Sequence, residues 1–254
     1  MSDREFVAVV LAAGAGTRLG ELGKRYSKPM VPVLGRPLLA LGVERLRSAG
    51  ARELVVVAHP ENLGLLEYLS EELPEARVVL QRERRGAADA VQKAFAALPQ
   101  VDEFLACACD SLFPVEDLIA LTRPMPGRPR VEAGVGVLEM GLEATRTRSA
   151  VQVRDRYVVE IVEKPQQPAS PLVALPVYWL PREIEPWLSN AALIGGENHV
   201  TTALAGFLAS GGQVRAVPFH QRLELTSPDD LPRLEDQLRG DARLPGSGVS
   251  PSRG

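Results

Sequence analysis

Glycines, an arginine and a lysine gather in one short stretch near the N-terminus of this 254-residue chain. Residues 6–11 form an apolar, β-branched run typical of a buried strand, and Gly14 and Gly16 follow it directly. Glycine lets the backbone turn tightly and lets main-chain N–H groups approach an anion without an intervening side chain. Arg18 and Lys28 add two cations, so the stretch has the donors and the charge that a polyphosphate requires.

A dinucleotide is the competing ligand for such a turn. The dinucleotide-binding motif expects an acidic residue ~20 positions on, at the end of the second strand, to hold the ribose. Here the second strand, at residues 53–58, ends at His59 and Pro60 without a carboxylate. The basic, proline-broken segment after the glycines also does not have the pattern of a crossover helix. Both observations favour a triphosphate.

The same stretch resembles the signature of the sugar-1-phosphate nucleotidyltransferases. LAAGAGTRLG at residues 11–20 provides a G-x-G-T-R core, and KPMVPVLGRPLL at residues 28–39 provides the K-P and the apolar strand that follow it. The family couples a nucleoside triphosphate to a phosphorylated sugar, which implies a Mg²⁺-dependent enzyme of nucleotide sugar biosynthesis. The resemblance assigns Arg18 and Lys28 to catalysis. It assigns nucleotide binding to Leu11, Ala12, Ala13, Gly14, Gly16 and Thr17.

Gln81 and Gly86 are the expected base-binding residues. In the family, a glutamine and a glycine at this spacing read a pyrimidine base. An amide presents a donor and an acceptor that match the O4 and N3–H edge of uracil or thymine, and a glycine lets the base stack on bare backbone. The alternative is a polar residue that leaves a strand and a glycine that starts a helix. Arg82, Arg84 and Arg85 between them are expected to be a solvated basic loop.

Two carboxylates are candidates for a metal site. Asp110 ends the apolar strand 104–109, where open α/β sheets bind ligands, and it resembles the family's catalytic aspartate that holds Mg²⁺. Its alternative role is a helix cap. Residues 222–228 resemble the family's W-x-D-x-G-T-P segment, whose aspartate is the second metal ligand. Glu224 stands at that position and Thr226 replaces the glycine. We expect Asp110 and Glu224 to hold Mg²⁺ together, since one or two protein carboxylates suffice for a phosphate-bound ion.

The acceptor side is marked by Glu163 and Lys164, which begin an E-K-P sequence. In the family the glutamate accepts hydrogen bonds from sugar hydroxyls and the lysine grips the sugar phosphate, and Val173 is expected on the next acceptor-contacting strand. Ala150 and Leu175 stand where the family usually has glycines, and both are expected to add bulk to this pocket. The acceptor is therefore a sugar 1-phosphate or a smaller phosphorylated alcohol.

Strands alternate with helices in the first half of the chain, which predicts parallel strands with helices on both faces. The expected fold class is α/β, a Rossmann-like three-layer sandwich with a mixed, mostly parallel sheet. A single domain is expected over residues 1–239, with a nucleotide-binding half at about 1–115 and an acceptor-binding half at about 116–239. Residues 240–254 are expected to be a disordered tail. The expected strands are 6–11, 53–58, 76–80, 103–109, 131–140, 150–153, 157–163, 173–180 and 214–218, and the expected helices are 38–47, 63–73, 86–98, 200–210 and one that starts at Ser227.

The charge and hydrophobic pattern of the chain limit the kinds of partner that it is expected to bind. The net charge is −3, so no strong positive field favours nucleic acid or an acidic membrane. The chain has no run of ~18 apolar residues and no signal-type N-terminus, which predicts a cytoplasmic protein. The expected partners are a nucleoside triphosphate and a phosphorylated small molecule, and monomer and homo-oligomer are both open.

The reaction expected is in-line attack of an acceptor phosphate oxygen on the α-phosphorus of UTP or dTTP, with loss of pyrophosphate. The chain has no visible Ser-His-Asp constellation, so position and charge are expected to supply catalysis. Two alternatives stay open. One is a cytidylyltransferase that acts on a small phosphorylated alcohol. The other is a non-catalytic nucleotide-binding relative, because Ala150, Glu224 and Thr226 depart from the family pattern.

Overall fold

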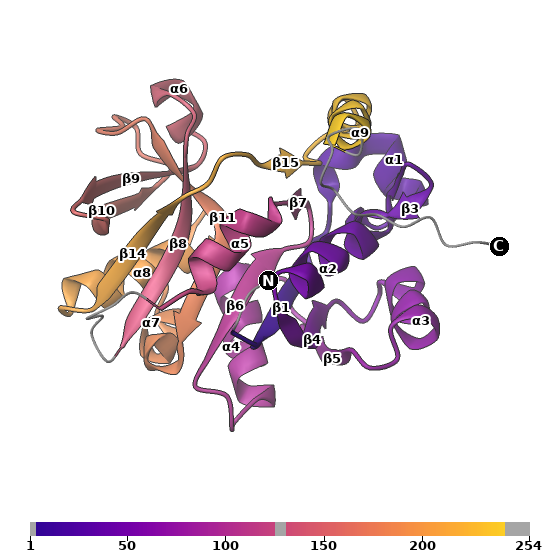
Figure 1. Cartoon of the computed structure of the whole chain (residues 1–254), viewed down its shortest axis with the longest axis horizontal. Helices are drawn as coiled ribbons and strands as arrows, with labels where there is room; N and C mark the ends of the chain where they lie inside the picture. The colour runs from indigo at the N-terminus through magenta and orange to yellow at the C-terminus, as the bar shows by residue number, and fades with distance from the viewer. Residues whose placement is uncertain (1–3, 125–130, 242–254) are drawn as a thin grey trace.

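One nine-stranded mixed sheet forms the centre of the molecule (Figure 1). The computed structural model describes residues 4–124 and 131–241. The strands pair in the order β5-β4-β1-β6-β11-β8-β14-β10-β9. Their bounds are β1 (Phe6–Ala12), β4 (Ala51–Ala58), β5 (Arg77–Leu80), β6 (Glu103–Ala108), β8 (Glu132–Glu139), β9 (Ser149–Arg154), β10 (Tyr157–Glu163), β11 (Leu172–Pro181) and β14 (Gln213–Pro218). The α/β fold with a mixed sheet is therefore confirmed.

The parallel pairs lie mainly in the first half of the chain. β5, β4, β1 and β6 are parallel neighbours, as alternating strands and helices predict. β11 then pairs antiparallel with both β6 and β8, and β10 pairs antiparallel with β9 and β14. Of these strands, β9 and β10 are joined by a tight turn at residues 155–156, and such a hairpin makes antiparallel neighbours.

Helices cover both faces of the sheet. On one face lie α2 (Leu38–Ser48), α3 (Leu63–Glu72) and α5 (Val115–Thr122), and on the other lie α4 (Ala87–Ala97), α7 (Glu185–Ser189) and α8 (Val200–Ala209). Each presents an apolar stripe to the sheet. In α2 the stripe is Leu39, Val43 and Leu46, at the three- and four-residue spacing that puts side chains on one face of a helix. None of the helices in the described residues is both long and apolar enough to cross a bilayer.

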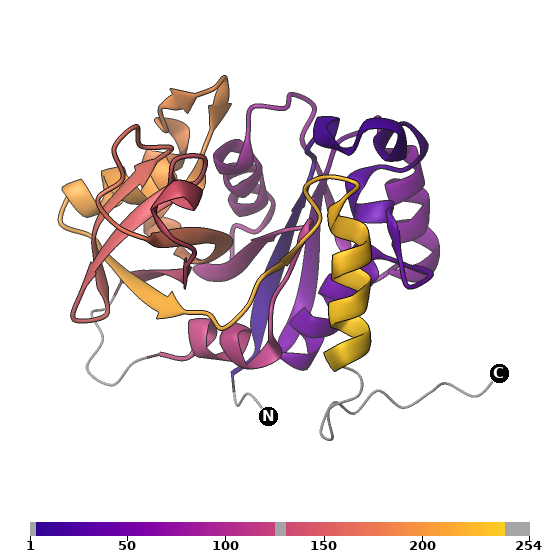
Figure 2. The ribbon, with the colours of Figure 1, turned by 90° about the horizontal axis from the view of Figure 1, so that it is seen from above.

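A third apolar cluster joins the two ends of the chain. The segment after β1 forms η1 (Thr17–Leu19), α1 (Gly20–Arg25) and η2 (Lys28–Met30), followed by the paired strands β2 (Pro32–Val33) and β3 (Arg36–Pro37). Figures 1 and 2 show the C-terminal helix α9 (Asp230–Asp241) beside this segment. Leu19 is fully buried there. It shares the cluster with Val31, Val33, Leu38, Leu41, Leu112, Leu223, Leu225, Leu234 and Leu238.

The basic segment after the glycines contains only the six-residue helix α1, which ends where Tyr26 turns extended, and no crossover helix. The predicted start of the last helix at Ser227 is wrong, since helix α9 begins at Asp230. The Asp230 carboxylate accepts hydrogen bonds from the Thr226 and Ser227 N–H groups at 2.8 and 2.7 Å, which holds residues 226–229 in a turn before the helix. Of the expected tail, residues 240 and 241 belong to α9, and residues 242–254 lie outside the described residues.

The second half of the chain docks on the first at Gly86. The hairpin of β12 (Leu193–Ile194) and β13 (Glu197–Asn198) brings the Asn198 N–H within 2.7 Å of the Arg85 carbonyl. Gly86 has φ +107°, and a Cβ on it would lie 2.4 Å from the Asn198 carbonyl oxygen. A glycine is therefore required here by the approach of another backbone segment, whatever its role towards a base.

We expect Gly86→Ala to lower the free energy of unfolding by about 1–3 kcal/mol, because the new Cβ meets backbone atoms and the φ is strained for an L-residue. Urea unfolding followed by circular dichroism measures the change. Gly64→Ala in α3 is the matched control. Gly64 has open space around it and no positive φ, so that variant should keep or gain stability, by up to about 1 kcal/mol. Equal stabilities for Gly86→Ala and the wild type would contradict the clash.

Candidate active site

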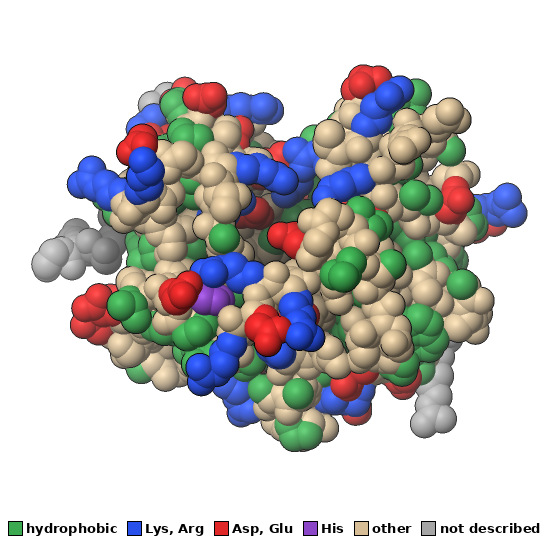
Figure 3. Space-filling view, turned by 180° about the vertical axis from the view of Figure 1, so that it is seen from behind, with side chains coloured by type: hydrophobic (Ala, Val, Ile, Leu, Met, Phe, Trp, Pro, Cys, Tyr) green, Lys and Arg blue, Asp and Glu red, His purple; other side chains and the backbone are tan. Residues whose placement is uncertain are grey.

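A cleft lies beyond the carboxyl ends of β1 and β6. β4 and β5 lie on one side of β1 and β6 lies on the other, so the connections diverge at this point, where open α/β sheets bind ligands. The cleft holds about 390 Å³, within the ~300–1,000 Å³ range of small-molecule sites. Figure 3 shows a recess between two lobes on this side, with charged side chains around it. The predicted residues that line the cleft are Leu11, Ala13, Gly14, Gly16, Thr17, Arg18, Lys28, Gln81, Gly86 and Asp110.

The glycine-rich turn faces the cleft with bare backbone. Gly14 is exposed, and a Cβ on it would meet no atom within 4 Å. Gly16 has φ +63°, and a Cβ on it would lie 3.4 Å from the Cβ of Lys28. The turn can therefore approach an anion closely, and the adjoining Leu19 fixes it in the third apolar cluster. The predicted residue Ala12 is 1% exposed and lies beneath the turn rather than in the cleft wall.

An ion pair joins the two sides of the cleft. Lys28 Nζ lies 2.6 Å from Asp110 Oδ2, and the Ser111 hydroxyl donates to Asp110 Oδ1 at 2.8 Å. Burial raises the pKa of Asp110, but the charges of Lys28 and Arg222 and the hydrogen bonds from Lys28 and Ser111 outweigh it and hold the pKa below its ordinary value. Asp110 is therefore an ionised carboxylate at neutral pH, as a metal ligand must be.

Cys109 also lines the cleft, next to Asp110. Burial raises the pKa of its thiol, and the Asp110 carboxylate raises it further. The thiol is thus neutral at pH 7, and a neutral thiol is a poor nucleophile. Cys109 is not suited to form a covalent intermediate, in agreement with the expected direct displacement.

Gln81 is 3% exposed, and its side-chain amide donates both of its N–H groups to neighbouring residues. Its Nε2 donates to the Gly86 carbonyl at 3.0 Å and to Asp89 Oδ2 at 2.6 Å. Both partners are acceptors, so the orientation of the amide is determined by its surroundings. Both N–H groups are used, and the amide oxygen is what remains for a ligand. The expected donor-and-acceptor pairing with a base is therefore reduced to an acceptor, because of Asp89, which the sequence alone did not single out.

Arg84 stands at the rim of the cleft and is less free than a solvated loop residue. Its Nη2 lies 3.1 Å from His59 Nδ1, and its side chain is 41% exposed. His59 Nε2 lies 3.1 Å from the Arg82 carbonyl, so this nitrogen carries the proton. His59 Nδ1 also accepts from the Glu61 N–H at 3.2 Å. The buried imidazole therefore ties Arg84 to the end of β4.

Glu224 lies beside Asp110, as predicted. β15 (Leu223–Glu224) pairs with β7 (Ser111–Leu112), and the Leu225 N–H donates to the Asp110 carbonyl at 2.9 Å. The Glu224 carboxylate is nevertheless occupied by two guanidinium groups that the sequence did not predict there. Arg148 Nη2 lies 2.6 Å from Oε1, and Arg222 Nη2 lies 2.9 Å from Oε2. No cluster of three or more metal-ligating side chains occurs in residues 4–124 and 131–241.

The residues therefore fit Mg²⁺ only in part. Asp110 is ionised, lines the cleft and can supply the single carboxylate that a phosphate-bound Mg²⁺ needs. Glu224 does not line the cleft, and both of its oxygens accept from arginines. A cation at Glu224 would therefore lie next to two guanidinium groups.

The expected acceptor residues lie outside the cleft wall. Glu163 Oε2 accepts from the hydroxyls of Thr201, at 2.6 Å, and Ser149, and the Glu163 side chain is 6% exposed. Lys164 is exposed with φ +47° at the end of β10. Val173 is fully buried in the sheet, where it pairs with Leu138.

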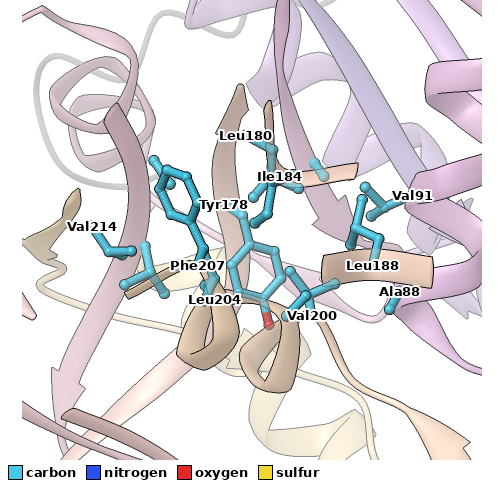
Figure 4. Packing of buried hydrophobic residues seen from close by; sticks show 14 of the residues in the cluster. Ala88, Val91, Tyr178, Leu180, Ile184, Leu188, Val200, Leu204, Phe207 and Val214 are labelled. Carbon is cyan, nitrogen blue, oxygen red and sulfur yellow. The ribbon is translucent and has the colours of Figure 1, made fainter. Parts of the chain in front are cut away.

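The expected bulk in the acceptor pocket is wrong for Leu175. Its side chain packs with Val177 under the face covered by α2, α3 and α5. Tyr178, which lines the cleft, belongs to the opposite face. Figure 4 shows the Tyr178 ring beside Leu204 and Val200. Residues an odd number apart in a strand point to opposite faces, so Leu175 cannot reach the cleft.

Comparisons with known proteins show the family of the chain and support its fold. The model of the family described as "Nucleotidyl transferase" matches residues 7–193. The UTP–glucose-1-phosphate uridylyltransferase AglF of Haloferax volcanii is 29% identical over 245 residues, which is 91% of this chain and 96% of AglF. A crystal structure of UDP-glucose pyrophosphorylase complexed with UDP-glucose superposes with a TM-score of 0.79 at 20% identity, over 94% of this chain and 100% of that one, and so supports the fold.

A third relative shares a shorter region. The CMP-5'-(3-aminopropyl)phosphonate synthase of Streptomyces rubellomurinus is 54% identical over 50 residues. The match covers 20% of this chain and 8% of that protein.

A double-mutant cycle tests the central ion pair. The pKa of Asp110 is lowered in the folded state, so its pairing with Lys28 stabilises the fold above the ordinary carboxyl pKa and is lost as pH falls through the folded pKa. We expect Lys28→Met, Asp110→Asn and the double variant to give a coupling free energy of about 0.5–3 kcal/mol at pH 7 that vanishes in strong acid. Chemical unfolding at several pH values measures it.

The exposed pair Glu21–Lys24 is the matched control, since its side chains are 87% and 73% exposed and its coupling should be near zero. A Lys28–Asp110 coupling as small as that of the control would contradict the account of this site.

Proposed function

Because this chain belongs to the nucleotidyl transferase family, we propose that it joins a pyrimidine nucleoside triphosphate, UTP or dTTP, to a sugar 1-phosphate and releases pyrophosphate. The main support for the proposal is the composition of the cleft. The glycine-rich turn, Arg18 and Lys28 line it together with Gln81 and Asp110. These residues come from four separate segments of the chain, and a polyphosphate with a base attached is the ligand that uses them all.

The protein's part in this reaction is position and charge. An oxygen of the acceptor phosphate attacks the α-phosphorus in line, and the bond from that phosphorus to the β-phosphate oxygen breaks. Arg18, Lys28 and the N–H groups of the turn hold the triphosphate and stabilise the charge that builds on the leaving pyrophosphate. Mg²⁺, when bound, would neutralise phosphate charge, and Asp110 would hold it. Lys28 then exchanges Asp110 for phosphate oxygens.

The Gln81 amide oxygen supports a base that presents a donor. The N3–H of uracil or thymine and the exocyclic N–H₂ of cytosine both meet this condition. Purines carry donors as well, so the expected preference for a pyrimidine rests on the family resemblance at Gln81 and Gly86 and not on this acceptor alone. Asp89 accepts from the Gln81 N–H₂ group and so fixes the orientation of the amide, which leaves the amide oxygen for the base. Base preference then depends on Asp89 as well as on Gln81.

Transfer of a cytidylyl group to a small phosphorylated or phosphonylated acceptor is the second candidate. It is favoured by the local 54% identity to a protein named as a CMP-phosphonate synthase. Glu163 also supports it, because Ser149 and Thr201 already donate to one oxygen of its carboxylate, Oε2. A smaller acceptor with fewer hydroxyls makes less demand on this carboxylate.

A panel of nucleoside triphosphates and acceptors decides between the candidates. With glucose 1-phosphate and Mg²⁺, we expect pyrophosphate release from UTP or dTTP and little from ATP or GTP. Release only from CTP with a phosphonate acceptor would support the second candidate. No release from any pair, with a folded protein, would overturn both.

With the active pair, Arg18→Ala should lower turnover by ~10²–10³, the usual effect of removing one preorganised charge. Arg52→Ala is the control, because Arg52 is 71% exposed and lies outside the cleft.

Asp89→Ala tests the base site. The substitution removes one of the two acceptors that hold the Gln81 amide, so the amide can rotate and the pocket loses its fixed acceptor. We expect the Kd of the preferred triphosphate to rise about tenfold, the equivalent of ~1.4 kcal/mol, and discrimination against other bases to fall. Calorimetric titration measures both effects. Lys93→Ala removes only the ion-pair partner of Asp89, 3.5 Å away, and should leave the Kd nearly unchanged. Unaltered base discrimination in Asp89→Ala would contradict the role of Asp89.

A further inference from the structure

Glu224 is clamped between two arginines from separate parts of the chain. Arg148 makes a two-point contact, with Nη2 2.6 Å from Oε1 and Nη1 3.2 Å from Oε2. Arg222 adds Nη2 at 2.9 Å from Oε2, and the Thr226 hydroxyl adds a contact at 3.3 Å. The Glu224 side chain is 19% exposed. Both oxygens of this carboxylate are engaged within the protein, and a Mg²⁺ ion bound to it would lie next to two guanidinium charges.

Arg222 is also linked to Asp110, the other carboxylate of the pair, through Ser111. Its side chain is 8% exposed, and its Nε donates to the Ser111 hydroxyl at 3.0 Å. The same hydroxyl donates to Asp110 Oδ1 at 2.8 Å. A continuous chain of contacts therefore runs from Glu224 through Arg222 and Ser111 to Asp110. The guanidinium provides a positive charge that links the two carboxylates.

We propose that Arg222 takes the place of a shared metal ion between Asp110 and Glu224. Asp110 is then the one protein carboxylate that binds the divalent cation, and Glu224 is a positioning residue that holds Arg222 against Ser111. The inference rests on the proposed function, because the ion concerned is the one that accompanies the triphosphate.

The two oxygens of Asp110 have different roles in this arrangement. Oδ1 accepts from Ser111, which Arg222 holds in place. Oδ2 faces Lys28 at 2.6 Å, on the side of the cleft. Oδ2 is therefore the oxygen that binds the cation once Lys28 has moved to the phosphates. Arg222 remains behind as a fixed positive charge, which needs no reorganisation during the reaction.

Metal affinity separates this arrangement from a two-carboxylate site. Mn²⁺ titrated into the full-length protein with α,β-methylene-UTP, which cannot react at the α,β-bridge, is followed by electron paramagnetic resonance. If the panel of triphosphates shows that the enzyme uses CTP, α,β-methylene-CTP replaces the UTP analogue. We expect Asp110→Asn to weaken Mn²⁺ binding at least tenfold and Glu224→Gln to leave it within about twofold of the wild type. Glu44→Gln, which breaks the exposed pair with Arg36, is the control for loss of an Arg–Glu contact.

Turnover provides the readout of positioning. Glu224→Gln should lower kcat while the Mn²⁺ concentration for half-maximal rate stays the same, because the variant disturbs Arg222 and not the metal ligand. Equal loss of Mn²⁺ affinity in Asp110→Asn and Glu224→Gln would overturn the proposal, and so would normal affinity in Asp110→Asn.

A crystal structure of the wild type with Mn²⁺ and the analogue tests the same point if Glu224→Gln does not fold. Anomalous scattering should place the ion on Asp110 with Glu224 still between Arg148 and Arg222. An ion about 2.2 Å from a Glu224 oxygen would overturn the proposal. Failure of the proposed function is distinct, since it would appear as no pyrophosphate release and no metal–nucleotide binding in the wild type.

Discussion

The ion pair between Lys28 and Asp110 connects two chain segments across the cleft. The segments lie close together because the strands that precede them, β1 and β6, are adjacent and parallel. Parallel β1 and β6 are neighbours, so the segments after them emerge side by side. The first carries the glycine-rich turn and Lys28, and the second carries Asp110 two residues after β6 ends. Because Lys28 Nζ and Asp110 Oδ2 are 2.6 Å apart, the anion-binding turn and the carboxylate face one cleft. The apolar cluster around Leu19 keeps the turn in this position.

Charge in and behind the cleft is divided between exchangeable and fixed cations. Lys28 and Arg18 line the cleft, and Lys28 has a flexible stem that can move from a carboxylate to a phosphate. Arg222 and Arg148 do not line the cleft and are held by directed contacts with Glu224, and Arg222 also donates to Ser111. Movement of both would leave Glu224 uncompensated. A triphosphate bound in the cleft would contact the side chains of Lys28 and Arg18. Arg222 would remain as a fixed positive charge on the far side of Asp110.

Features that depend on local sequence were predictable. The strand at residues 157–163 has the predicted bounds, and Asp110 and the glycine-rich turn stand at strand ends because short apolar runs stop there. Contacts between distant residues were not predictable in this way. Arg148 and Glu224 are 76 residues apart in sequence. The expected place of Leu175 in the acceptor pocket was taken from the family resemblance, which does not show towards which face of the sheet the side chain points.

The contact at Gly86 makes the two halves of the site depend on each other. The carbonyl of Gly86 accepts from the Gln81 amide, while its missing side chain admits the backbone of Asn198. Glu197, the neighbour of Asn198, lines the cleft. One glycine thus sets the position of the Gln81 amide and of a hairpin from the second half of the chain. A shift of that hairpin would move Gly86 and with it the acceptor for Gln81, so the Gln81 amide and the far wall of the cleft cannot vary independently.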